Sequence, residues 1–118
     1  MKSYLFILSF LITISHAQKA DVLKAVAHCN PYGSCNFDVT IRHDDEGWKH
    51  FANAYDIVTH SGEVLATRIL HHPHINEQPF TRSISNVKIP KGVKSVIIRA
   101  NDLIHGYGGK EIQLQLYK

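Results

Sequence analysis

The sequence predicts an all-β fold, an antiparallel β-sandwich of immunoglobulin-like or fibronectin-like type with about seven strands. Three observations predict it. Short segments alternate apolar and polar residues, no stretch shows a helical period, and turns containing glycine, proline or asparagine separate the segments. The length allows a single sandwich domain, which we expect at residues 18–118.

The first residues are typical of a secretory signal. Lys2 precedes an apolar run at residues 4–14, and Ser15 and Ala17 follow at the positions that signal peptidase reads. The run is shorter than the roughly 20 residues that a membrane-spanning helix needs. We therefore expect residues 1–17 to be removed, leaving a periplasmic or secreted domain without membrane insertion.

The first four expected strands are separated by short connections. Residues 20–28 enter a turn with proline and glycine, and residues 35–43 leave it with apolar residues on one side only, as in a sheet with one solvated face. A polar connection follows, in which Trp48 is expected to fold back on the core. Residues 51–59 and 64–70 are joined by a turn that contains glycine.

The last three expected strands begin within a central insert. Residues 71–82 hold three histidines and two prolines, and their end continues into an extended segment at residues 80–89. A Pro-Lys-Gly turn stops it. Residues 93–100 alternate again, and a glycine-rich loop at 101–109 leads to the final strand at 110–117.

The two cysteines, Cys29 and Cys35, flank the first turn. An even pair in an exported chain is expected to form a disulfide. Two thiolates of a zinc site are the alternative, but their spacing is longer than the gap of common zinc motifs.

Several function classes are not favoured. The net charge of +3 is too small for a binder of nucleic acid, which shows a basic stripe or cluster. No Gly-x-Ser-x-Gly elbow is present, so we expect no enzyme. The glycines at 106, 108 and 109 precede a strand, so no helix N-terminus could hold a phosphate there.

Histidine is the outlying residue type, with nine copies. Imidazole is a common ligand of zinc and copper(II), so the sequence predicts a site for a divalent metal ion used in storage, delivery or sensing. The only methionine is Met1, which excludes a thioether site for copper(I) in the exported part. The candidate ligands are His72, His74, His43, His50 and His105, with Glu77 as an oxygen ligand or as an orienting partner.

Other interpretations stay open. Trp48, Phe51, Tyr107 and Arg82 could instead form a metal-free surface for an envelope protein or a glycan. The histidines could also form a purely structural network, which acid would then destabilise. The carboxylates at 44–46 could bind calcium, but their spacing favours a solvated acidic turn.

Four strings carry a resemblance: HDDEGW at 43–48, HHPH at 71–74, EQPFTRS at 77–83 and HGYGG at 105–109. Together they resemble a group of small, exported bacterial proteins of unassigned function. The resemblance implies export and a single domain, and it transfers no chemistry.

Overall fold

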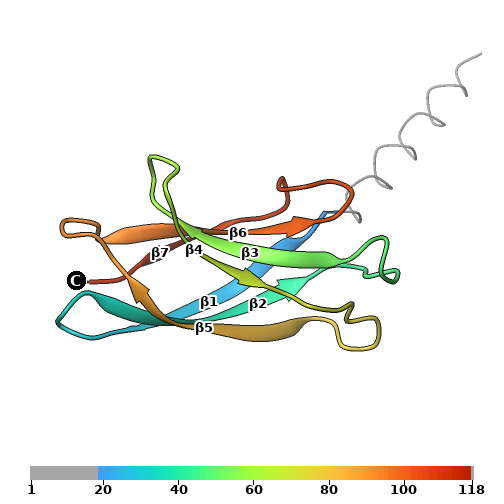
Figure 1. The fold of residues 1–118 in the computed structure, drawn as a ribbon, viewed down its shortest axis with the longest axis horizontal. Helices are drawn as coiled ribbons and strands as arrows, with labels where there is room; N and C mark the ends of the chain where they lie inside the picture. The colour runs from blue at the N-terminus through green and yellow to red at the C-terminus, as the bar shows by residue number, and fades with distance from the viewer. Residues whose placement is uncertain (1–18, 118) are drawn as a thin grey trace, which may run out of the picture.

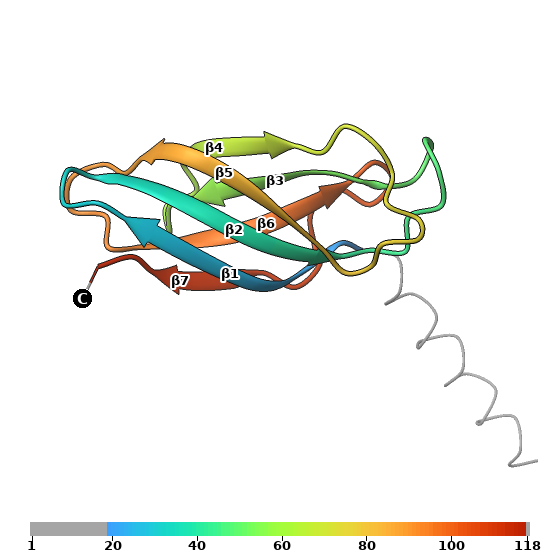
Figure 2. The ribbon, with the colours of Figure 1, turned by 90° about the horizontal axis from the view of Figure 1, so that it is seen from below.

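The computed structural model describes residues 19–117, and the expected signal at residues 1–17 lies outside them. Seven antiparallel strands form two sheets that face each other (Figures 1 and 2). The strands are β1 (Asp21–Cys29), β2 (Ser34–Arg42), β3 (Ala52–Val58), β4 (Val64–Ile69), β5 (Phe80–Lys88), β6 (Ser95–Asp102) and β7 (Ile112–Gln115). Within residues 19–117, no helix is long and apolar enough to cross a membrane.

One sheet has the order β1-β2-β5, and the other has the order β4-β3-β6-β7. The predicted all-β sandwich is therefore confirmed. β4 pairs with β3, whereas constant-type immunoglobulin domains place the fourth strand beside the fifth, in the sheet of the first and second. The cysteine prediction is also confirmed, since Cys29 and Cys35 form a disulfide across the β1-β2 hairpin.

The core lies between the two sheets and follows the alternation of the strands. Phe37, Val39 and Ile41 of β2 are fully buried, as are Val96 and Ile98 of β6. Burial of a side chain of this kind stabilises the fold by about 1.5–3 kcal/mol. The alternation therefore fixes which face of each strand points inward.

Two sequence predictions need correction. β6 continues to Asp102 because that residue still pairs with Ala52 of β3, so the following loop is shorter than expected. Trp48 does not fold back on the core: it is 68% exposed. It lies in a tight turn closed by the bridge between Gly47 and His50, and it is His50 that points inward.

The connections after β2, β4 and β6 lie at one end of the sandwich (Figure 1). Hydrogen bonds join them: Leu103 N donates to Phe51 O at 3.2 Å, and His74 N donates to Asp45 Oδ2 at 2.7 Å. This end therefore gathers histidines that are far apart in the sequence. The β6-β7 connection is held close to β1, since a Cβ added at Gly109 would lie 1.9 Å from Ala20 O.

Candidate metal centre

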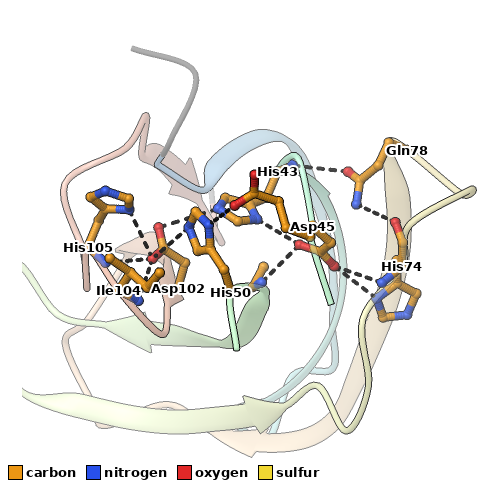
Figure 3. A network of polar contacts seen from close by, with 10 residues as sticks. His43, Asp45, His50, His74, Gln78, Asp102, Ile104 and His105 are labelled. Atoms are coloured by element: carbon orange, nitrogen blue, oxygen red, sulfur yellow. Dashed lines mark hydrogen bonds and ion pairs between the residues drawn. The ribbon is translucent and has the colours of Figure 1, made fainter. Parts of the chain in front are cut away.

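Three histidines from two connections surround one carboxylate at this end (Figure 3). His43 directly follows β2, His50 precedes β3, and His105 lies in the β6-β7 loop. Asp102 is the last residue of β6. His43, His50 and Asp102 are buried. His43 and Asp102 continue the alternation of β2 and β6 onto the inward face, and His50 lies two residues before the buried Ala52.

His43 is held between two carboxylates. Its Nδ1 lies 2.6 Å from Asp45 Oδ1, and both side chains are fully buried. A carboxylate can only accept, so Nδ1 carries the hydrogen and donates it. The other ring nitrogen, Nε2, then faces Asp102 Oδ2 at 3.5 Å.

His50 repeats this arrangement from another segment. Its Nδ1 donates to Glu46 Oε1 at 2.5 Å, and its Nε2 lies 3.6 Å from Asp102 Oδ1. The His43 and His50 rings meet edge to face with centroids 4.8 Å apart. Two Nε2 atoms therefore face the same carboxylate.

Asp102 is fixed by the loop that follows it. Its Oδ1 accepts hydrogen bonds from the backbone N–H groups of Ile104, at 2.9 Å, and His105, at 2.6 Å. The ring Nδ1 of His105 lies 3.3 Å from the same oxygen. Among residues 19–117, Asp102 Oδ2 and His50 Nε2 are buried without a hydrogen-bond partner.

The spacing of these atoms suits a metal ion. His43, His50 and Asp102 each offer one ligand atom, and the three atoms lie within 4.8 Å of one another. Ligands about 2.1 Å from a tetrahedral zinc are about 3.4 Å apart. His43 Nε2 lies 3.5 Å from Oδ2 of Asp102, and His50 Nε2 lies 3.6 Å from Oδ1, so each imidazole is at this spacing from a different oxygen of the carboxylate. Carboxylates on the remote ring nitrogens are the usual partners of metal-binding histidines.

Asp45 connects this group to the central insert. Besides His43 it accepts from the backbone N–H of Ala52 at 3.0 Å and of His74 at 2.7 Å. Burial raises the pKa of Asp45, but the bonds from His43, His74 and Ala52 outweigh it and hold the pKa below the usual value. Gln78 adds a further link, accepting from His43 N and donating to His74 O.

The structure divides the predicted ligands. His43, His50 and His105 lie around Asp102. His74 is buried nearby, but its ring stacks on Phe80 with centroids 4.0 Å apart. His72 and Glu77 are exposed: the His72 ring lies 4.7 Å from that of His74, and Glu77 pairs with Arg82 at 3.1 Å.

Sequence reasoning missed three carboxylates of this group. Asp102 was placed in a loop, and Asp45 and Glu46 in a solvated turn. The prediction of a solvated turn is right for Glu46, which is exposed, and wrong for Asp45, which is buried. The alternation along β6 could have indicated the inward position of Asp102, because this residue continues the series of inward residues Ile98 and Ala100.

Comparison with known proteins found a similar protein that matches part of this chain. A protein of Halomicrobium mukohataei named "Putative lipoprotein" is 40% identical over 74 residues, which make up 63% of this chain. The matched residues cover 36% of that protein's length, so this chain resembles only a part of it. No family model matches the chain. No solved structure matches it either.

Proposed function

We propose that this chain is an exported domain that binds a divalent transition metal, zinc or copper(II), for storage, delivery or sensing. The ligands are His43 Nε2, His50 Nε2 and the carboxylate of Asp102. His105 lies next to Asp102 and is partly exposed, but it is outside the group of three ligand atoms, so it would have to turn inward to act as a fourth donor. It could thus exchange the metal with solvent or with an acceptor.

A single observation carries the proposal. Both histidines donate through Nδ1 to a carboxylate and turn Nε2 toward Asp102, and His50 Nε2 and Asp102 Oδ2 are buried without a hydrogen-bond partner among residues 19–117. A buried imidazole nitrogen and a buried carboxylate oxygen without partners destabilise the fold unless a cation lies between them. A bound metal ion supplies that cation, and protonation of one imidazole is the competing arrangement.

The donor set limits the choice of metal. Two imidazoles and one carboxylate suit zinc and copper(II), whereas calcium and magnesium prefer oxygen ligands only. The same set with open positions occurs in non-haem iron(II) sites, so iron(II) belongs in any metal panel.

Export is supported by two observations. The first residues follow the pattern of a secretory signal. A similar protein carries the name lipoprotein, preceded by "putative". Periplasmic or secreted location is our inference from both, and the disulfide between Cys29 and Cys35 agrees with an oxidising compartment.

The test is a titration of chelator-treated protein with zinc, copper(II) and iron(II), followed by calorimetry and by metal analysis after desalting. We expect one equivalent of zinc or copper(II) to bind. Asp102→Asn should lose it while keeping an oxygen to accept from Ile104 and His105. Asp44→Asn, which removes an exposed negative charge at the same end, is the control.

Binding that survives in Asp102→Asn would refute the assigned site. No binding of any of the three metals by the parent would refute the proposal and favour protonated imidazoles in a structural network.

A second candidate function has its own observation. Trp48, Leu103 and Ile104 are exposed on two connections that are joined by the bond from Leu103 N to Phe51 O. Exposed apolar side chains gathered on neighbouring loops can mark a contact surface. A metal-free module for an envelope protein or a glycan would use this surface, and it would bind its partner equally well in Asp102→Asn.

A further inference from the structure

A pocket of about 120 Å³ lies beside the candidate metal centre, where β4 and β5 approach each other. Its lining contains two arginines and three histidines over one apolar side chain, and no acidic side chain of residues 19–117 lines it. The lining residues are Arg68, Leu70, His71, His72, His74 and Arg82.

Both arginines are oriented by the backbone. Arg68 donates through Nε to Ser83 O at 2.8 Å and through Nη1 to Ile69 O at 2.6 Å. Arg82 donates through Nη1 to Thr81 O at 2.7 Å, and its guanidinium lies over the Phe80 ring, 5.5 Å from the centroid. Guanidinium groups held in this way lose little freedom when an anion binds.

His74 supplies the second observation. It is 5% exposed and lines the pocket. Its Nδ1 lies 3.9 Å from Asp45 Oδ2, beyond hydrogen-bond distance, and neither ring nitrogen has a hydrogen-bond partner among residues 19–117. A buried donor without a partner costs about 1–3 kcal/mol. The ring is held in place by stacking on Phe80, so its nitrogen cannot simply turn toward solvent.

We propose that this pocket binds a small oxyanion, a phosphate or a carboxylate group. Arg68 and Arg82 supply the positive charge, and His74 donates one hydrogen bond. Arg82 shares its charge with the exposed Glu77, so the anion competes with Glu77 for that guanidinium. The site is separate from the metal centre and does not depend on a bound metal.

The experiment is an NMR titration of the chelator-treated protein with inorganic phosphate and, in a parallel arm, with acetate, at constant ionic strength in chloride. We expect saturable shifts of the signals of His72, His74 and the arginine side chains with at least one of the two anions. The arm that saturates identifies the class of oxyanion.

Variants make the result specific. Arg82→Gln and His74→Phe should each weaken binding about tenfold, because each removes a hydrogen bond to a charged group. Glu77→Gln should strengthen it, since Arg82 is then released. Lys88→Gln, which removes an exposed charge at the other end of β5, is the control and should leave the affinity unchanged.

Two results would overturn the proposal. One is a titration in which neither phosphate nor acetate gives saturable shifts at the pocket. The other is an equal loss of affinity in Lys88→Gln and Arg82→Gln, which would indicate a general effect of net charge.

Discussion

His43 and His50 lie among carboxylates, whereas His72 and His74 line a pocket with two arginines, although Asp45 Oδ2 also lies 3.9 Å from His74 Nδ1. In the first pair, Asp45 and Glu46 hold the Nδ1 atoms and both Nε2 atoms face a third carboxylate. In the second pair, the rings share a pocket with two guanidinium groups. Both pairs are at the same end of the sandwich, so the charged neighbours of each imidazole determine which ligand it can hold.

The comparison also shows a difference in energetics. Asp45 is buried and accepts from a ring and from two backbone groups in separate segments. Glu77 makes an exposed ion pair with Arg82. Removing a buried carboxylate that has several donors costs far more stability than removing one partner of an exposed pair. The candidate metal centre is therefore part of the folded framework, and the pocket lies on its surface.

The largest expected effect is that of Asp45→Ala on stability. It should lower the free energy of unfolding by about 3–5 kcal/mol, because it leaves three buried donors without an acceptor. Urea denaturation measures it. Asp44→Ala, an exposed neighbour, should change stability by less than about 0.5 kcal/mol. A loss below about 1 kcal/mol in Asp45→Ala would show that the first region is not a buried framework.

The next effect is stabilisation by metal. A free zinc concentration of about a hundred times the dissociation constant should raise the free energy of unfolding by about 2.7 kcal/mol, because zinc binds the folded state and not the unfolded chain. His50→Gln should abolish the rise, and His72→Gln should keep it. Thermal unfolding with and without zinc measures both. Loss of the rise in His72→Gln alone would reverse the assignment of the two histidine pairs.

The pH dependence of stability should report His74. Burial lowers its pKa below the usual value of 6.5, and Arg82 and His72 lower it further. Between 6.5 and the lower folded pKa the unfolded chain binds more protons, so stability should fall as the pH drops below about 6.5. His74→Phe keeps the stacking on Phe80 and should reduce this slope. If urea denaturation between pH 7 and pH 5 gave the same slope of stability against pH for His74→Phe as for the parent protein, the account would be contradicted.

The smallest expected effect is that of Glu77→Gln on stability. Exposed ion pairs contribute about 0–1 kcal/mol, so removing this one should lower the free energy of unfolding by less than that. Urea denaturation at low and high salt measures it. A loss above about 2 kcal/mol would show that the insert depends on Glu77 as strongly as the candidate metal centre depends on Asp45.

The fold was predictable from the sequence because the strands alternate clearly. In β2 and β6 the inward positions are apolar almost without exception, and each strand is bounded by a turn. The order of the strands was not predictable, since period-two alternation does not tell which strands become neighbours. β3 and β4 pair across a short connection, whereas the pairing of β2 with β5 and of β3 with β6 joins segments that are distant in the sequence.

The candidate site was predictable only in part. The abundance of histidine pointed to metal, and His43, His50 and His105 were among the predicted ligands. The adjacent pair His72 and His74 drew the prediction toward the insert because proximity in the sequence was the only distance available. Asp102 was missed because its role depends on the meeting of connections that are separated by more than fifty residues.

The most direct test of the different roles of the two histidine pairs is a long-range ¹H–¹⁵N NMR spectrum of the imidazoles, recorded before and after one equivalent of zinc. We predict that His43 and His50 coordinate through Nε2, with the hydrogen on Nδ1, while the ring nitrogens of His72 and His74 show no coordination shift. Coordination shifts on His72 and His74, with His43 and His50 unchanged, would contradict the account.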